Sequence, residues 1–266
     1  MSLTIAAVGG VAIIASARAE TISVYSAGSL RTAVAALIKE AGLPSDVEVK
    51  PTFGGSGLLR QRIEGGESAD LFLSADMGSP RMLADARRAV APAIAFARNE
   101  MCLIAGKSVG VTQDNLVDRL LTKDLRLAAS TPVQDPAGDY AVAIFDRIDA
   151  VRPGAGATLR AKAQHLTAGQ NPVPPAPGRG VAASLFLNDQ TDLMISYCSG
   201  AAAIEKEAPD VAAIEFPASL DVHPIYGMVV LSMNPNALRL ALFILSEKGQ
   251  AILKESGLLP VLAISQ

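Results

Sequence analysis

The feature that most constrains the fold is an alternation of short apolar segments with amphipathic helical segments, joined by turns of small residues. The first hundred residues show the pattern three times. The strands are expected at 22–25, 47–53 and 71–74, and the helices that follow them at 30–40, 58–64 and 80–87. Strands that alternate with helices in this way predict a parallel sheet with right-handed crossovers. The sequence therefore predicts an α/β fold.

A second alternating run follows in the middle of the chain. Strands are expected at 100–105, 126–130 and 193–197, and a helix at 139–149. Four prolines within 171–178 exclude a helix or a central strand there and predict a surface connection. The chain ends with a strand-like segment at 222–231 and helices at 236–246 and 249–256. Two α/β lobes, with the chain crossing between them, are the natural architecture for this order.

The first twenty residues do not follow this pattern. The apolar run from Leu3 to Ala15 is shorter than the roughly 20 residues that a membrane-spanning helix needs. Small residues at Ala17 and Ala19 occupy the −3 and −1 positions of a cleavage site, although no Lys or Arg precedes the run. This layout predicts that residues 1–19 are a secretory signal peptide. We therefore expect a soluble protein in the periplasm.

Composition excludes several classes of protein. The net charge is −3, and no block of Lys or Arg is present, so no nucleic-acid partner is expected. Two cysteines and two histidines, all far apart in sequence, do not make a zinc site, and no metal cation is expected. In an oxidising compartment Cys102 and Cys198 are compatible with a disulfide, but two buried free thiols fit equally well.

Polar chemistry concentrates in two turns of the same design. Each has an apolar strand, small residues, a serine and then a helix, and the serines are Ser29 and Ser56. Helix N-termini carry unpaired N–H groups and partial positive charge, and they favour anions. If both serines stand at N-caps, their hydroxyls lie beside those N–H groups. Two such turns predict an anion site, although serines at these positions also cap their own helices.

Two later turns have candidate donors as well. The turn 134–140 opens a helix with the N–H of Ala137, and Tyr197 ends an apolar strand. A secreted hydrolase that uses Ser56 or Cys198 as nucleophile is the alternative from another class. It is disfavoured because Leu58 breaks the G-x-S-x-G pattern and because neither His165 nor His223 has a supporting spacing. No catalytic residue is therefore assigned.

The motifs resemble one family along the whole chain after residue 19. The segments that carry the resemblance are Val-Tyr-Ser-Ala-Gly-Ser-Leu at 24–30, Phe-Gly-Gly-Ser-Gly-Leu-Leu at 53–59, Ala-Asp-Leu-Phe-Leu-Ser-Ala-Asp at 69–76 and Pro-Ala-Gly-Asp-Tyr-Ala at 136–141. In order and spacing they are similar to the molybdate-binding (ModA-like) family of periplasmic solute-binding proteins, which serve ABC importers.

This resemblance implies a type II periplasmic-binding-protein fold of two α/β lobes, each with a mainly parallel sheet. Lobe 1 comprises residues 20–103 plus 222–266, and lobe 2, residues 104–221, is inserted in it. The implied ligand is a tetrahedral oxyanion, molybdate or tungstate, which would bind by hinge closure without a cofactor. Its donors would be the hydroxyls of Ser29, Ser56 and Tyr197 and the N–H of Ala137. The implied partner is a membrane permease, and a monomer is expected.

One charged residue departs from the neutral donors of that family. Arg179 lies in the loop where a further family amide is expected, near 178–180. A guanidinium matches a planar carboxylate with two parallel hydrogen bonds. An Arg179 in the cleft would therefore favour a receptor for another oxyanion or a small organic acid, whereas an exposed loop arginine would leave the ligand unchanged.

Overall fold

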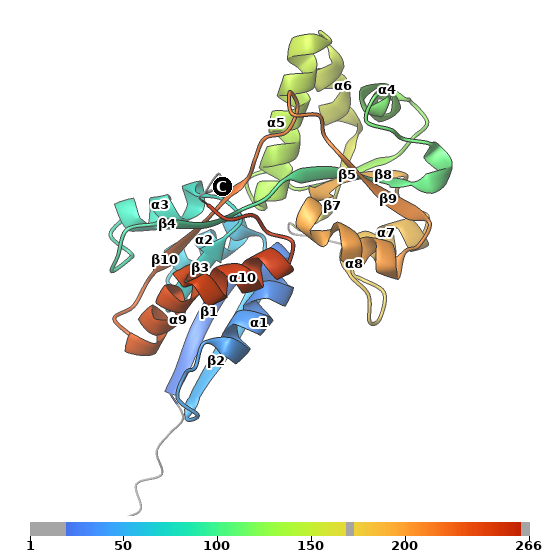
Figure 1. The fold of residues 1–266 in the computed structure, drawn as a ribbon. Coiled ribbons are helices and arrows are strands. Elements are labelled where there is room, and N and C mark those ends of the chain that lie inside the picture. Colours follow the sequence, from blue (N-terminus) through green and yellow to red (C-terminus); the bar gives the residue numbers. More distant parts are fainter. Residues whose placement is uncertain (1–19, 169–172, 262–266) are drawn as a thin grey trace, which may run out of the picture.

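The computed structural model describes residues 20–168 and 173–261, and its strands form two separate five-stranded sheets (Figure 1). The first has the order β2-β1-β3-β10-β4, with bounds Val47–Gly54, Glu20–Ala27, Leu71–Ser74, Ile225–Val230 and Ile94–Arg98. The second has the order β7-β6-β8-β5-β9, with bounds Ala163–Thr167, Leu127–Ser130, Leu193–Tyr197, Met101–Gly106 and Val211–Glu215. The expected signal peptide, residues 1–19, lies outside the described residues.

Both sheets follow one plan. β2, β1 and β3 are parallel, and so are β7, β6 and β8. The other two strands of each sheet run antiparallel to their neighbours, and they are the strands that lead into or out of the connections between the lobes. β3 and β6 are buried at every residue, as expected for central strands that helices cover on both faces.

The helices divide between the two sheets. Lobe 1 carries α1 (Arg31–Glu40), α2 (Ser56–Glu64), α3 (Gly78–Asp85), α9 (Pro235–Leu245) and α10 (Glu247–Glu255). Lobe 2 carries α4 (Leu116–Leu121), α5 (Pro136–Val151), α6 (Ala155–Lys162), α7 (Val181–Leu187) and α8 (Ala201–Glu207). Three short 3-10 turns, Gly28–Leu30, Lys107–Val109 and Cys198–Gly200, complete the described elements. No helix in the described part of the chain is long and apolar enough to cross a membrane.

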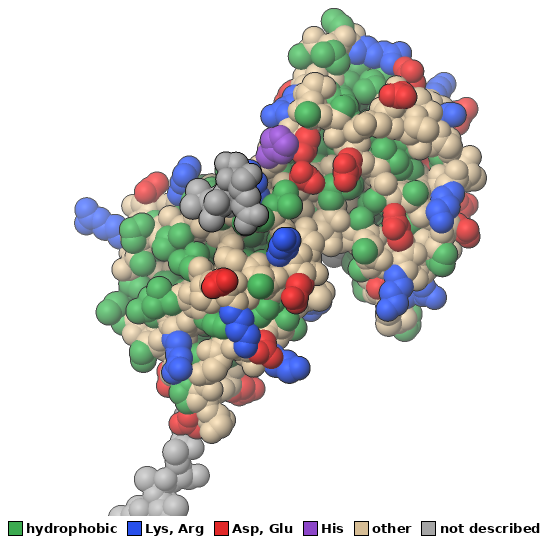
Figure 2. Space-filling model, viewed as in Figure 1, with side chains coloured by type: hydrophobic (Ala, Val, Ile, Leu, Met, Phe, Trp, Pro, Cys, Tyr) green, Lys and Arg blue, Asp and Glu red, His purple; other side chains and the backbone are tan. Residues whose placement is uncertain are grey.

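The chain crosses between the lobes twice. Asn99 and Glu100 connect β4 to β5, and residues 216–224 connect β9 to β10. The expected boundary between residues 103 and 104 therefore falls inside β5, because the apolar segment 101–105 is one strand of the second sheet. α9 and α10 return to lobe 1 and pack beside α1. Figure 2 shows the resulting two masses with a narrow junction and a notch between them.

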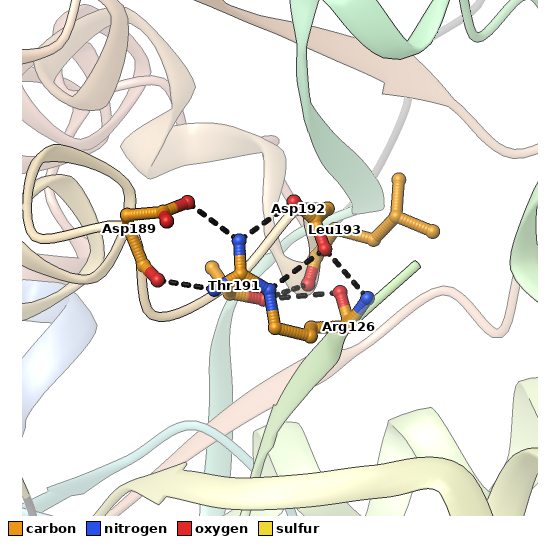
Figure 3. A network of polar contacts seen from close by, with 5 residues as sticks. All are labelled: Arg126, Asp189, Thr191, Asp192 and Leu193. Carbon is orange, nitrogen blue, oxygen red and sulfur yellow. Dashed lines mark hydrogen bonds and ion pairs between the residues drawn. The ribbon is translucent and has the colours of Figure 1, made fainter. Parts of the chain in front are cut away.

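A polar network fixes the start of β6 next to the start of β8 (Figure 3). The backbone N–H of Arg126 donates to Asp192 at 2.7 Å, and its guanidinium binds the carboxylates of Asp192 and Asp189. The guanidinium holds the pKa of Asp192 below its usual range, with burial opposing it. Thr191 donates its hydroxyl proton to the carbonyl of Leu193 at 2.6 Å. This network orders the entry to two neighbouring parallel strands.

Cys102 and Cys198 form a disulfide, so the first of the two alternatives is the one found. Cys102 lies in β5, three residues after the Asn99 crossing, and Cys198 directly follows β8. The bond connects positions 96 residues apart in sequence, and it lies in lobe 2 beside the first crossing.

Candidate functional site

The first serine turn follows β1 and faces a buried tyrosine. Ser29 lies in the 3-10 turn that precedes α1, and its hydroxyl makes no helix-capping hydrogen bond. Instead, Ser29 Oγ lies 3.0 Å from the hydroxyl of Tyr226, a fully buried residue of β10. The expectation that Ser29 stands at an N-cap is therefore wrong, and its hydroxyl is directed across the sheet rather than back to its own helix.

The second serine turn follows β2 and is buried. Ser56 is the first residue of α2, and Gly55 occupies the N-cap position, so this serine does not cap its helix either. Ser56 is 1% exposed, and its Oγ accepts a hydrogen bond from the N–H of Ala75 at 3.0 Å. Ala75 directly follows β3, so the ends of two neighbouring strands meet at this serine.

Glycines in the second turn let lobe 2 approach the backbone of lobe 1. A Cβ on Gly55 would lie 2.4 Å from the carbonyl oxygen of Gln134, and one on Gly57 would lie 1.9 Å from that of Val133. The N–H of Leu58 donates to the Gln134 carbonyl at 3.1 Å. Only residues without a side chain fit there. The turn at 54–57 is therefore a contact surface between the lobes.

Lobe 2 contributes the N-terminus of α5, which Asp135 caps. Asp135 accepts hydrogen bonds from the N–H of Ala137 at 3.2 Å and from the hydroxyl of Ser130 at 2.6 Å. The amide of Ala137, expected to face a ligand, therefore donates to a carboxylate of its own chain in this structure. Burial raises the pKa of Asp135, the bonds from Ser130 and Ala137 oppose the rise, and the charges of Asp139 and Asp76 add to it.

Tyr197 lies where β8 ends, at the junction of the lobes. It is 6% exposed, and within the described part of the chain its hydroxyl has no hydrogen-bond partner. The rings of Tyr226 and Tyr140 pack edge-on against it, with centroids at 5.6 and 6.3 Å. Burial holds the pKa of Tyr197 well above its ordinary value, so the hydroxyl stays a neutral donor.

These residues form one connected group. Ser29 reaches Tyr226, the ring of Tyr226 contacts Tyr197, and that of Tyr197 contacts Tyr140. The hydroxyl of Tyr140 donates to the carbonyl of Ala75 at 3.2 Å, and the N–H of Ala75 donates to Ser56. The structure therefore brings Ser29, Ser56 and Tyr197 to one interlobe region, with Ala137 and its capping carboxylate beside the second turn. We call this group the interlobe site.

Arg179 is not part of the interlobe site in this structure. It is exposed, and its guanidinium donates to the carbonyl of Glu207 at 2.5 Å. Glu207 ends α8, whereas Tyr197 lies before the start of that helix. The N–H of Gly180, in the loop where a family amide was expected, donates to the carboxylate of Glu207 at 2.6 Å. The guanidinium thus lies at the far end of α8 from Tyr197.

The structure does not support Ser56 or Cys198 as the nucleophile of a hydrolase. Cys198 is in the disulfide and has no free thiol. Ser56 bonds to the Ala75 amide, while His165 Nδ1 lies 2.8 Å from the Ser130 carbonyl and His223 Nδ1 lies 2.9 Å from Asp221. Neither histidine hydrogen bonds to Ser56. In the described ranges, no group of three or more His, Cys, Asp or Glu side chains has the geometry of a metal site.

Sequence reasoning missed four residues of this region. Tyr226 and Tyr140 supply rings and hydroxyls, and Asp135 caps α5. Asn99 donates from Nδ2 to Tyr226 at 3.0 Å and to Ser199 of lobe 2 at 2.8 Å. Asp135 followed by Pro136 is a sequence signal for a helix start that points to the cap. Tyr226 has no comparable local signal.

Comparison with known proteins identifies the family. The sequence profile described as Bacterial extracellular solute-binding protein matches residues 22–259. A protein of Pasteurella multocida is 36% identical over 243 residues, which cover 89% of this chain and 98% of that relative. The molybdate-binding protein ModA of Escherichia coli is 27% identical, with 81% of this chain and 79% of ModA covered.

Solved structures agree on the fold. The sulfate-binding protein SubI of Mycobacterium tuberculosis superposes with a TM-score of 0.71 at 18% identity, covering 91% of this chain and 87% of SubI. The two five-stranded sheets with flanking helices are the type II periplasmic-binding-protein fold, as predicted. The match over residues 22–259 shows that the chain belongs to the bacterial extracellular solute-binding protein family.

Proposed function

We propose that this protein is the periplasmic receptor of an ABC importer and that it binds a tetrahedral oxyanion, molybdate or tungstate, at the interlobe site. It carries its ligand unchanged and catalyses no reaction. The ligand is held without a cofactor, and the liganded monomer docks on a membrane permease. The likeness to the Escherichia coli molybdate-binding protein supports this choice of anion.

The buried hydroxyl of Tyr197 is the observation that carries the proposal. A buried hydroxyl without a partner costs about 1–3 kcal/mol, and an oxyanion oxygen is the acceptor that removes this cost. Ser29 and Ser56 lie on the opposite lobe, in turns that follow the neighbouring parallel strands β1 and β2. Ligands of open α/β sheets bind at this edge, beyond the carboxyl ends of the strands.

Donors from both lobes explain why a ligand would close the protein. Only an arrangement with the lobes in contact presents Tyr197 together with Ser29 and Ser56. A ligand that binds this arrangement more tightly than an open one shifts the population toward it. The two crossings, at Asn99–Glu100 and at 216–224, are the positions about which such a hinge would turn.

Calorimetric titration with molybdate, tungstate, sulfate, phosphate and citrate tests the proposal. We expect heat with at least one of the group-six oxyanions. Tyr197→Phe should weaken binding about tenfold, which corresponds to about 1.4 kcal/mol, because it removes one hydrogen bond to a charged group. The matched control is Tyr25→Phe, since Tyr25 is a buried tyrosine of lobe 1 whose hydroxyl binds Glu67 away from the interlobe site.

Two outcomes would contradict the proposal. If neither molybdate nor tungstate gives heat, the proposed ligand is wrong, although the chain still belongs to the solute-binding protein family. If the Tyr197→Phe and Tyr25→Phe variants bind the anion with equal affinity, the buried Tyr197 hydroxyl is not a donor to it. Tight binding of citrate alone would instead favour an organic-acid receptor.

A further inference from the structure

The carboxylate of Asp135 occupies a position where an anion-binding protein would be expected to receive its ligand. It lies at the N-terminus of α5, a helix of 16 residues, and accepts hydrogen bonds from the N–H of Ala137 and the hydroxyl of Ser130. Free N–H groups at such an end attract anions. In this structure the N–H of Ala137, which the resemblance assigns to an oxyanion, already donates to a carboxylate.

Asp135 also faces lobe 1 directly. A Cβ on Gly55 would lie 3.2 Å from the Cβ of Asp135, and Gly55 precedes the buried Ser56. The ring of Tyr197 packs edge-on against Tyr140 of α5, the helix that Asp135 caps, with centroids at 6.3 Å. Asp135 is therefore inside the same contact region as the proposed ligand donors.

The charged groups around Asp135 do not neutralise it. Asp139 on its own helix and Asp76 after β3 are both acidic, and both raise its pKa. Arg60 lines an interlobe pocket with Asp76 and Asp139, but its guanidinium pairs with Glu64 at 2.5 Å. On the β7 side, His165 bonds to the carbonyl of Ser130. Within the described residues, no Lys or Arg forms an ion pair with Asp135.

An independent feature of this region, the hydroxyl of Tyr197, points to a ligand. The hydroxyl of Tyr197 is buried and has no hydrogen-bond partner within the described residues. A doubly charged oxyanion that binds Tyr197 would lie beside the Asp135 carboxylate in a buried place. Two like charges that share such a site do not both stay ionised, because their repulsion raises the pKa of one of them.

We propose that Asp135 is a specificity-determining residue that couples oxyanion binding to the uptake of one proton. The inference rests on the proposed function, and it concerns the same site. One O–H bond forms, either on the carboxyl of Asp135 or on an oxygen of the anion, and the proton comes from solvent. The two oxygens then share a hydrogen bond in place of two adjacent charges.

A carboxylate in the site would distinguish anions by whether they carry a proton. An anion that keeps a proton at neutral pH, as phosphate does, brings its own hydrogen-bond donor to Asp135. Sulfate carries no proton at that pH, so it binds only when Asp135 itself is protonated. An ionised carboxylate is purely an acceptor, and this gives the site a means of discriminating among tetrahedral anions of similar shape.

Titration with sulfate and molybdate from about pH 6 to about pH 8.5 tests this inference on the wild type and on Asp135→Asn. We expect the affinity of the wild type for both dianions to fall by up to about tenfold per pH unit, which is the slope for one bound proton. Asp135→Asn keeps a good helix cap but does not titrate, so its affinity should not change with pH. Asp139→Asn, one turn away, is the matched control and should keep the slope.

Each outcome decides between the two proposals. If wild type and Asp135→Asn bind with the same pH dependence, the coupling is overturned while the oxyanion receptor stands. If neither protein binds any oxyanion at any pH, the proposed function fails, and the inference fails with it. A flat Asp135→Asn profile beside a sloping wild type and a sloping Asp139→Asn supports the coupling.

Discussion

The two serines of the interlobe site differ in what their hydroxyls support. Ser56 accepts from the buried N–H of Ala75, whereas Ser29, which bonds to the hydroxyl of Tyr226, lies at an exposed position where water can take its place. Ser56→Ala leaves the Ala75 amide without an acceptor, and we expect it to lower the free energy of unfolding by about 1–3 kcal/mol. Ser29→Ala should cost less than about 1 kcal/mol. Urea unfolding of both variants and the wild type measures the difference.

The control for this comparison is a third serine. Ser108 lies in an exposed turn of lobe 2, and Ser108→Ala should leave stability unchanged. Equal losses in the Ser29 and Ser56 variants would contradict a larger contribution of the Ser56–Ala75 hydrogen bond to stability.

Single residues of the interlobe site were predictable only where a local pattern marks them. Ser29 and Ser56 follow apolar strands and Tyr197 ends one, and ligands of α/β sheets bind at the carboxyl ends of strands. Tyr226 lies inside β10, and its contact with Ser29 spans 197 residues of sequence. No local signal reports a contact of that range. Arg179 was a candidate from its loop, and the tertiary structure places it against α8 instead.

At the scale of elements, segments with a strong hydrophobic period were predicted well. The expected helix 236–246 is α9, Pro235–Leu245, and the expected strand 71–74 is β3. The polar segment around His165 is not among the expected strands, yet it forms the edge strand β7 beside β6. An edge strand buries few side chains, so pairing with its neighbour decides its structure more than its own sequence does.

The turn between β2 and α2 supports a prediction about contact between the lobes. Gly57→Ala places a methyl group 1.9 Å from the Val133 carbonyl oxygen, which belongs to the other lobe. We expect the variant to hold the lobes apart, because the neighbour it meets is backbone. Small-angle scattering should give a larger radius of gyration, and ligand affinity should fall at least tenfold.

The matched control is Gly106→Ala in lobe 2. A Cβ there meets its nearest neighbour at 3.7 Å, an ordinary contact. That variant should keep the wild-type radius and affinity. An unchanged radius for Gly57→Ala would contradict the assignment of this turn as the contact between the lobes.

At the scale of the whole molecule, the two lobes were predicted from the order of the elements, but the disulfide was not. The bond between Cys102 and Cys198 closes a loop with a sequence separation of 96 residues. Loops of this size restrict the unfolded chain strongly, and removal of such a bond costs about 2–5 kcal/mol. We therefore expect the variant Cys102→Ala/Cys198→Ala to lose that much stability in urea unfolding. A reductant should destabilise the wild type and leave the variant unchanged. Equal stability of the two proteins without reductant would show that the disulfide does not stabilise the fold.

The net charge of the molecule determines how the association rate of the anion depends on ionic strength. The chain carries −3, and on the face shown in Figure 2 basic and acidic side chains are interspersed on both lobes. An anion gains no long-range attraction from such a surface, so recognition must rest on hydroxyl and amide donors at short range. Raising ionic strength from about 0.01 M to about 0.15 M shortens the Debye length from about 30 to about 8 Å. The association rate of molybdate should therefore stay constant or rise over this range in stopped-flow measurements. A receptor that attracts its ligand through a basic field would show the opposite, and a severalfold fall in that rate would contradict a site built from neutral donors.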